Sequence, residues 1–219
     1  MRYFISPHFD HEKLENPTVG DLVDVFEDRM RNWLLLPSKH LIETPHGLVA
    51  ATALMSSYFE GIEIYLTGKD SNNRSAEFFV NGFLRVFSVH GEGKKMLKKT
   101  AEGIYKQLRC GFAHDGMFRY RVFFDNTLPK AMLVTSPKKN GGFDTTGALE
   151  SIAINPTRFH ECIMIHFEGY VKRLREETDQ ELNSAFRNAV QLKWGLDKPD
   201  INIGMSEEGY RDFCRKGQA

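Results

Sequence analysis

"GLVAATALMSSYFEGIEIYLTG", residues 47–68, is the stretch that decides the fold. Its apolar residues cover most sides of the predicted helix instead of forming one stripe, which is typical of a helix at the centre of a bundle. Gly68 stands where the helix should stop, because glycine readily adopts the left-handed conformation that ends many helices. The segment therefore predicts a central helix with other helices packed around it.

The segment upstream predicts a first helix. "NPTVGDLVDVFEDRMRNWLLLP", residues 16–37, opens with Asn16 as a candidate N-cap before Pro17 and then carries apolar residues at helical spacing. Pro37 is expected to end or kink this helix, because proline has no backbone N–H to donate.

Downstream, two more helices are expected before the pattern changes. Residues 75–89 predict an aromatic-rich helix, and the sequence "HGEG" at residues 90–93 breaks it. Residues 92–110 predict a fourth helix, with Met96, Leu97, Thr100, Ile104, Gln107 and Leu108 along one broad stripe.

After Gly116 the pattern indicates strands. "RYRVFFD" (119–125) and "AMLVTSP" (131–137) predict two strands around the turn "NTLPK", and "LESIAIN" (149–155) is a candidate third. Residues 156–177 predict a long helix opening at Pro156, and residues 179–194 either continue it or form a separate helix.

Together these segments predict a mainly α fold, a helical bundle with a small β-hairpin inserted before the C-terminal helices. We expect one domain over residues 1–219, with its core at about residues 17–194 and a peripheral tail at about residues 195–219.

Composition narrows the class of protein. The 29 basic and 29 acidic residues balance, so bulk charge gives no argument for a nucleic-acid partner. The three cysteines, Cys110, Cys162 and Cys214, form no paired framework, which favours a reducing cytoplasm. The first residues are too acidic for a signal peptide, and no apolar run approaches the ~18 residues of a membrane span, so no membrane association is expected.

"YKQLRCGFAHDG", residues 105–116, carries the candidate chemistry. Arg109 and His114 would lie about 140° apart on a straight helix, so they share a face only if the helix ends or distorts between them. Gly111 and Gly116 would make such a departure cheap. In the alternative, Gly116 caps the helix, His114 lies in its last turn and Arg109 is an ordinary surface residue.

An arginine and a histidine can together cleave a phosphodiester bond when the substrate supplies the nucleophile. Histidine moves protons near neutral pH, and arginine can hold a phosphate with two hydrogen bonds. In RNA, the 2′-hydroxyl group is the internal nucleophile.

"LRCGFAHDG" resembles the R-x4–6-H motif of HEPN domains, the helical domains of many RNases, and the order of helices over residues 17–194 is similar to theirs. The resemblance implies a homodimer in which two motifs face one RNA-binding cleft. By resemblance, Arg109 would stabilise the scissile phosphate, His114 would act on protons, and Glu60 would orient one of them. Many family members have a polar residue after the arginine, whereas this chain has Cys110.

The resemblance further implies metal-independent cleavage that leaves a 2′,3′-cyclic phosphate and a 5′-hydroxyl. Family members often serve as toxins or in phage defence, where an antitoxin or regulatory protein restrains them. The alternatives are a non-catalytic HEPN-like module that binds nucleotide, RNA or a protein, and a structural helical protein in which the motif is only a helix cap.

Charged residues around the motif give further candidates. Residues 90–121 hold eight basic residues against three acidic ones, an excess that could guide RNA or simply form a solvated helix face. Glu60 and Glu63 lie in the apolar central helix and need either solvent or a partner. The candidate RNA-binding residues are Lys95, Lys98, Lys99, Lys106 and Arg119.

No cofactor or metal site is expected. His8 with His11 and Cys162 with His166 are isolated pairs, and two ligands do not make a site. The chain contains no Walker loop, no GxGxxG and no GxSxG.

Overall fold

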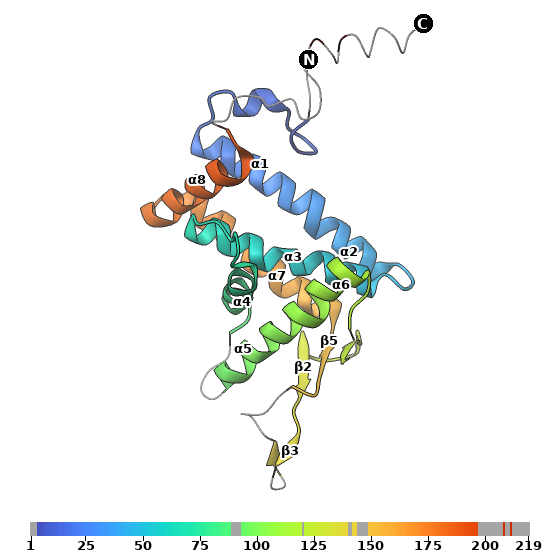
Figure 1. Cartoon of the computed structure of the whole chain (residues 1–219). Coiled ribbons are helices and arrows are strands. Elements are labelled where there is room, and N and C mark those ends of the chain that lie inside the picture. The colour runs from blue at the N-terminus through green and yellow to red at the C-terminus, as the bar shows by residue number, and fades with distance from the viewer. Residues whose placement is uncertain are drawn as a thin grey trace, which may run out of the picture.

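The computed structural model describes residues 4–88, 93–119, 121–139, 142–143 and 149–196, together with Glu208 and Arg211. The chain is mainly helical, with a small sheet before the last two helices, as the sequence predicts (Figure 1). Most of the tail expected at residues 195–219, including Cys214, lies outside the described residues. No helix in the described part is long and apolar enough to cross a membrane.

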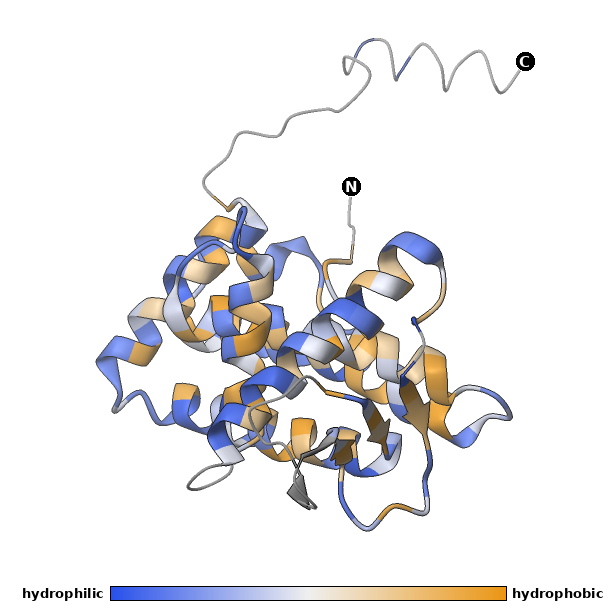
Figure 2. Cartoon of the chain, turned by 60° about the horizontal axis from the view of Figure 1, so that its bottom comes forward, coloured by the Kyte–Doolittle hydropathy of each residue, from blue (hydrophilic) through white to orange (hydrophobic). Residues whose placement is uncertain are grey.

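Helix α3 (Leu48–Thr67) lies at the centre of the bundle and ends at Gly68, whose φ is 65°. It packs against α2 (Leu36–Glu43), α4 (Ser75–Val86), α7 (Pro156–Glu176) and α8 (Gln180–Trp194). The prediction of a central helix is thus confirmed. In Figure 2 hydrophobic and hydrophilic stretches alternate along the surrounding helices, as expected for helices with one buried face.

Helices α3 and α4 cross in close contact. A Cβ atom on Gly82 would lie 1.9 Å from the carbonyl oxygen of Phe59, so only glycine permits this approach. The Phe59 ring contacts Phe79, Phe83 and Phe159 with centroid distances of 5.3, 5.1 and 5.6 Å. These aromatic contacts fasten α4 and α7 to α3.

The first helix differs from the prediction at both ends. Helix α1 (Val19–Arg29) is capped by Thr18, whose side chain and backbone exchange hydrogen bonds with Asp21, and not by Asn16. A π-helical turn (Met30–Leu35) then joins α1 to α2, so Pro37 does not end the helix. We attribute this to the wider turn, which relieves the clash between the proline ring and the preceding carbonyl.

The three expected strands form, but their pairing corrects the predicted hairpin. Strands β1 (Val122–Phe124) and β2 (Met132–Thr135) do not pair with each other, because β5 (Ser151–Ile154) lies between them. Strand β5 is parallel to β1 and antiparallel to β2. Asn155 explains this arrangement, since its side-chain amide donates to the carbonyls of Asn126 and Leu128 and so ties the connecting turn to the end of β5.

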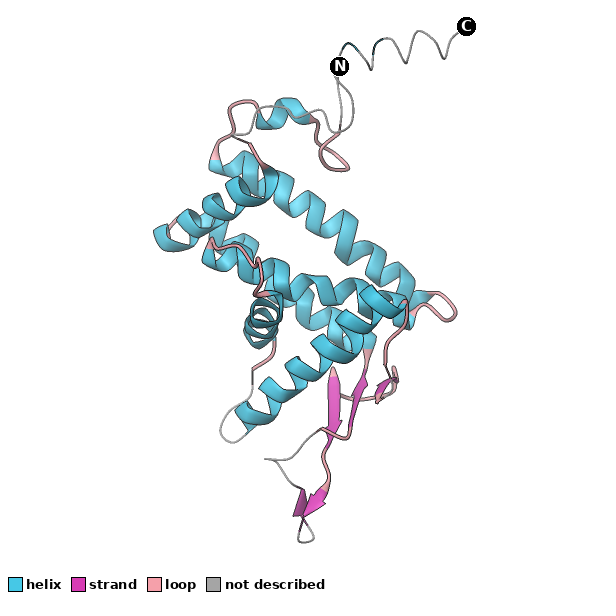
Figure 3. Ribbon diagram, in the orientation of Figure 1, coloured by secondary structure: helices cyan, strands magenta, loops and turns pink. Residues whose placement is uncertain are grey.

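The sheet lies beside the helix that carries the motif (Figure 3). Its buried residues Val122, Ile152 and Ile154 belong to the same core cluster as the helices. A short ribbon, β3 (Lys138–Lys139) with β4 (Gly142–Phe143), extends from β2. Helices α7 and α8 are separate, since Asp179 caps α8 through a bond from the backbone N–H of Leu182.

Candidate functional site

The motif lies on one continuous helix that changes its winding. Helix α5 (Gly93–Ile104) continues through a π-helical turn, η3 (Tyr105–Arg109), into α6 (Cys110–Asp115). Gly116, with φ of 71°, caps α6, and His114 lies in the last turn. The π-helical turn ends at Arg109 itself, and residues 110–115 between it and the cap are α-helical. On an ideal α-helix, a separation of five residues corresponds to about 140°, so the helix gives Arg109 and His114 no common face within one chain.

The chain folds back sharply after this cap. The backbone N–H of Arg119 donates to the carbonyl of Gln107 over 2.9 Å, which anchors residues 117–119 against the π-helical turn. Gly111 makes room for the return, because a Cβ atom there would lie 2.9 Å from the carbonyl oxygen of Met117. This reversal leaves the end of α6 projecting into solvent, where residues 112–117 are exposed.

Arg109 is half-buried, and among the described residues its side chain has neither a hydrogen-bond nor an ion-pair partner. Its electrostatic neighbour is Tyr105. Burial raises the pKa of the Tyr105 hydroxyl, the hydrogen-bonded Cys110 thiol and Glu60 raise it further, and Arg109 lowers it. Tyr105, Cys110, Glu60 and Arg109 therefore form one neighbourhood where α3 meets the π-helical turn.

Glu60 reaches the motif only through this neighbourhood. Its Oε1 atom accepts a hydrogen bond from the buried Ser71 hydroxyl over 2.8 Å. No direct hydrogen bond joins Glu60 to Arg109 or His114 within the described residues. The expected orienting role of Glu60 therefore stays a prediction. Glu60 and Arg109 are both electrostatic neighbours of Tyr105, so an effect of Glu60 on Arg109 would act through Tyr105.

Glu63 has an ion-pair partner within the fold, which was one of the two outcomes expected from the sequence. Its side chain is only 5% exposed and lies 3.2 Å from the Nε atom of Arg85. Glu63 is the buried member of this pair, and removing the exposed Arg85 would leave its charge uncompensated, so the pair contributes to the fold.

His114 is exposed, and within the described residues it has no hydrogen-bond partner. Two large apolar side chains flank it, Phe112 at 39% exposed and Met117 at 66% exposed. A helix end that presents apolar side chains to solvent is a candidate contact surface.

The four lysines among the predicted RNA-binding residues lie along the same helix, and Arg119 follows its cap. Lys95, Lys98 and Lys106 are exposed and Lys99 is half-buried, so α5 and the π-helical turn carry a basic, solvent-facing side. Arg119 is exposed but pairs with Asp115 over 3.0 Å, so its charge is partly neutralised. Arg109 is therefore flanked by lysines on one side and by this pair on the other.

The isolated pairs considered from the sequence have local partners. The Nδ1 atom of His8 lies 2.6 Å from Asp28, and the Nδ1 atom of His166 lies 2.8 Å from the Tyr58 hydroxyl. Across the described ranges, no three His, Cys, Asp or Glu side chains come together in a way that could hold a metal ion.

Sequence reasoning missed Tyr105 and Ser71. Tyr105 stands four residues before Arg109, a spacing that places both on neighbouring turns and could have drawn attention to it. Ser71 lies in a loop, and nothing in the sequence connects it with Glu60.

Comparison with models of protein families, with curated proteins and with solved structures finds no match to this chain. A half-buried guanidinium without a carboxylate partner can bind an anion, and a solvent-exposed imidazole at the same helix end can exchange protons.

Proposed function

We propose that the chain is a metal-independent endoribonuclease of the HEPN type, with Arg109 and His114 as its catalytic residues. The observation that carries this proposal is the Arg109 side chain, which is half-buried yet has no counter-ion in the described part of the protein. Charged groups removed from water normally have a partner. An RNA phosphate would supply it.

The proposed reaction needs three groups. The 2′-hydroxyl of the substrate attacks the adjacent phosphorus atom and loses its proton, and the bond to the 5′-oxygen breaks as that oxygen gains a proton. The imidazole of His114 takes part in this proton transfer, and the guanidinium of Arg109 stabilises the negative charge on the phosphate. The products are a 2′,3′-cyclic phosphate and a 5′-hydroxyl.

A second copy of the chain would complete this site. Five residues of α-helix turn through about 140°, so the helix does not favour directing both motif side chains of one chain at one phosphate. The exposed Phe112 and Met117 offer apolar surface at the same place. We therefore propose a homodimer in which Arg109 of one chain and His114 of the other line a shared cleft.

The lysines of the motif helix would guide the RNA to that cleft. Lys95, Lys98 and Lys106 are exposed along α5 and the π-helical turn, and each phosphate contact releases bound counterions. This support is electrostatic and carries no sequence preference.

A non-catalytic module is the second candidate, and the regular helix between Arg109 and His114 favours it. If no second chain brings a histidine opposite Arg109, this residue can still bind the phosphate of a nucleotide or RNA, or an acidic group of a protein partner. The position after the arginine also fits this candidate, because it holds a cysteine, whose thiol interacts with Tyr105, instead of the polar residue that many family members have.

As a nuclease, the chain would act in the cytoplasm, in a toxin or phage-defence setting, and an antitoxin or regulatory protein would restrain it. This setting rests on the resemblance of the motif alone.

An RNA cleavage assay tests the proposal. Mixed-sequence single-stranded RNA should be cut by the wild-type protein, and Arg109→Ala or His114→Ala should each reduce the rate by about 100-fold or more. Arg158→Ala and His40→Ala are matched controls, because both side chains are exposed on other helices, and they should leave the rate unchanged. The 3′ ends should resist phosphatase until acid opens the cyclic phosphate.

Cleavage that survives in folded Arg109→Ala and His114→Ala would contradict the proposal. RNA binding that depends on Arg109 without any cleavage would favour the non-catalytic module.

A further inference from the structure

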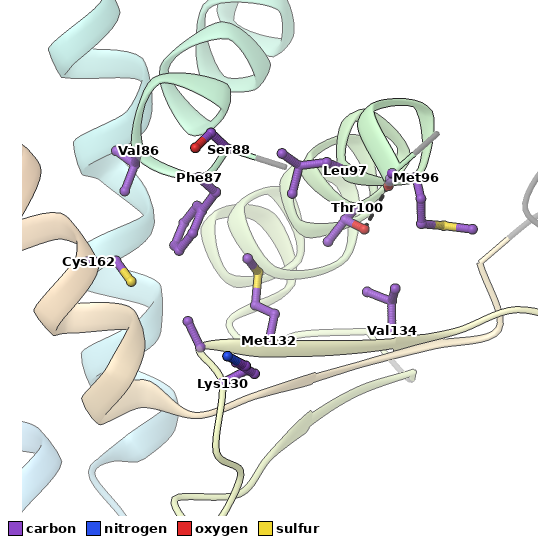
Figure 4. Close-up of a pocket in the computed structure, with 12 residues that line it drawn as sticks. Val86, Phe87, Ser88, Met96, Leu97, Thr100, Lys130, Met132, Val134 and Cys162 are labelled. Carbon is purple, nitrogen blue, oxygen red and sulfur yellow. Dashed lines mark hydrogen bonds between the residues drawn. The ribbon is translucent and has the colours of Figure 1, made fainter. Parts of the chain in front are cut away.

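A cavity of about 580 Å³ lies away from the motif, where the helices meet the sheet. Figure 4 shows it between the end of α4, the first half of α5, strand β2 and helix α7. The Phe87 ring, the Met132 and Val134 side chains and the Cys162 sulfur point toward the space. Its volume falls within the range of roughly 300–1,000 Å³ that is typical of small-molecule sites.

The walls of this cavity are mostly apolar. Val86, Phe87, Met96, Leu97, Met132 and Val134 supply most of the surface, and methionines adapt to ligands of varied shape. The buried Thr100 hydroxyl donates to the Met96 carbonyl over 2.9 Å, so its hydrogen is already engaged. An apolar chain fits such a lining better than a polar ligand does.

Among the described residues that line the cavity, one carries a formal charge, and it is basic. Lys130 stands just before β2, and its side chain is exposed and has no ion-pair partner among the described residues. The described lining includes no aspartate or glutamate. In the part of the chain that the structure describes, the cavity therefore combines an apolar lining with one positive charge at the solvent.

We propose that this cavity binds a single-chain amphiphile with an anionic head group. The alkyl chain would lie between Phe87, Leu97 and Met132, and the head group would lie at Lys130. A carboxylate, as in a medium-chain fatty acid, and an alkyl phosphate share this chemistry. The site uses neither Arg109 nor His114, so it does not rest on the proposed nuclease activity.

Packing in the neighbourhood sets this space apart from an ordinary defect. Protein interiors are close-packed, and voids larger than a water molecule are few. The core next to the cavity follows that rule, with Phe83 and Phe159 fully buried and Phe87 in ring contact with both. The open space lies where the end of α4, the first half of α5 and α7 face β2, and a ligand there would recover the missing contacts.

Titration calorimetry with the full chain tests the site, using octanoate, decanoate, decyl phosphate and decanol below their micelle concentrations. Each added methylene should tighten binding about fourfold, so decanoate should bind roughly 15-fold more tightly than octanoate. Decanol should bind more weakly than decanoate. The tighter of decanoate and decyl phosphate identifies the head group.

Two variants locate the ligand. Lys130→Ala should weaken decanoate to the level of decanol, whereas Lys69→Ala, an exposed lysine outside the lining, should change neither ligand. Val134→Phe should fill the cavity and reduce binding of all four ligands at least tenfold.

A measurement on the wild-type protein covers the case in which Val134→Phe does not fold. Bound decanoate should slow maleimide labelling of Cys162, which lines the cavity, and leave labelling of Cys110 unchanged. The proposal is overturned if decanoate gives no binding heat at about 1 mM, the weak end of specific binding. It is equally overturned if the affinity changes neither with Lys130→Ala nor with the length of the alkyl chain. The same holds if bound decanoate does not slow maleimide labelling of Cys162.

Discussion

At the scale of single residues, Arg109 and Glu63 show two ways of placing a charge in the fold. Glu63 is buried and paired with Arg85, so its negative charge is compensated within the protein. Arg109 is half-buried beside Tyr105 and has no counter-ion in the described chain. The unpaired charge is the one that a ligand can use.

Arg109→Lys should therefore be a poor substitute in catalysis. Lysine keeps the positive charge but cannot form two parallel hydrogen bonds to one phosphate. We expect cleavage to fall by about 100-fold, while the free energy of unfolding changes by less than about 0.5 kcal/mol, because the side chain has no partner to lose. Single-turnover cleavage and urea unfolding measure the two effects.

The control for this change is Arg119→Lys. Arg119 pairs with Asp115 at the surface, and a surface pair tolerates lysine. If Arg109→Lys and Arg119→Lys cleave equally well, the two-bond grip of Arg109 on the phosphate is refuted.

His166 should make the fold sensitive to acid. Burial, followed by the nearby Arg85 and Arg173, lowers the pKa of His166 below 6.5 in the folded protein. The unfolded chain therefore takes up this proton more readily, so the stabilisation present above pH 6.5 is lost as the pH falls through that value. The free energy of unfolding, measured in urea at several pH values, should fall less steeply in His166→Gln than in the wild type.

The exposed His40 supplies the control for this pH dependence. His40→Gln should retain the wild-type slope. Equal slopes in the wild type and His166→Gln would show that the His166–Tyr58 hydrogen bond does not sense protonation.

At the scale of secondary-structure elements, sequence periodicity located the helices but not their joints. Apolar spacing predicted α3 and α4 well, because burial on one or several faces leaves a direct trace in the sequence. The π-helical turns at residues 30–35 and 105–109 leave no such trace. That is why Pro37 was expected to end or kink the helix, whereas the helix continues past it with its winding changed at residues 30–35.

Strand pairing could not be derived from the same patterns. Alternation identified the strands, but the partner of each strand depends on contacts distant in sequence. Asn155, just beyond β5, binds the turn between β1 and β2, a contact that accompanies the order β1-β5-β2 and that strand alternation does not reveal. Likewise, the sequence placed Arg109 and His114 at a helix end, but it could not reveal Ser71 beside Glu60.

The crossing of α3 and α4 should depend on Gly82. Gly82→Ala would place a methyl group 1.9 Å from the Phe59 carbonyl oxygen, so the helices must separate and the aromatic cluster must loosen. We expect a loss of about 3 kcal/mol or more in the free energy of unfolding. Thermal and urea unfolding monitored by circular dichroism measure it.

Gly169→Ala in α7 is the matched control, because no atom lies within 4 Å of the added methyl group. That change should stabilise the protein by about 1 kcal/mol, the usual gain of alanine over glycine inside a helix. If Gly82→Ala stabilises the protein as Gly169→Ala does, the two helices do not meet closely at Gly82.

At the scale of the whole molecule, apolar surface is exposed beside the motif. Phe112 and Met117 are at the end of α6, and Phe123 on β1 is 57% exposed in the neighbouring sheet. A symmetric dimer would bury such a surface on both copies at once. This geometry would also bring two motif helices together, as the proposed reaction requires.

We expect the wild-type chain to scatter light as a dimer, with twice the 25.2 kDa mass of one chain. The double change Phe112→Glu and Met117→Glu should produce a folded monomer, because charges at the centre of an apolar interface oppose association. Leu192→Glu on α8, which is 46% exposed and distant from α6 in Figure 1, should remain dimeric. A wild-type monomer at micromolar concentration would remove the shared cleft from the proposal.

The assembled protein should cut RNA without divalent metal ions, and only where the substrate provides its own nucleophile. In the proposed dimer, Arg109 supplies the positive charge that stabilises the phosphate, His114 handles the proton, and the 2′-hydroxyl attacks. Cleavage should therefore persist in EDTA, and it should stop on DNA of the same sequence. RNA with a single 2′-O-methyl group should resist cutting at that position alone and be cut normally elsewhere, because every contact except the nucleophile is retained.

Mixing inactive Arg109→Ala with inactive His114→Ala tests the dimer in the same assay. In a mixed dimer, the intact Arg109 of one chain lies opposite the intact His114 of the other, so the mixture should regain activity. Magnesium-dependent cutting of DNA by the purified protein would overturn this mechanism and, with it, the assignment of Arg109 and His114 as a joint site.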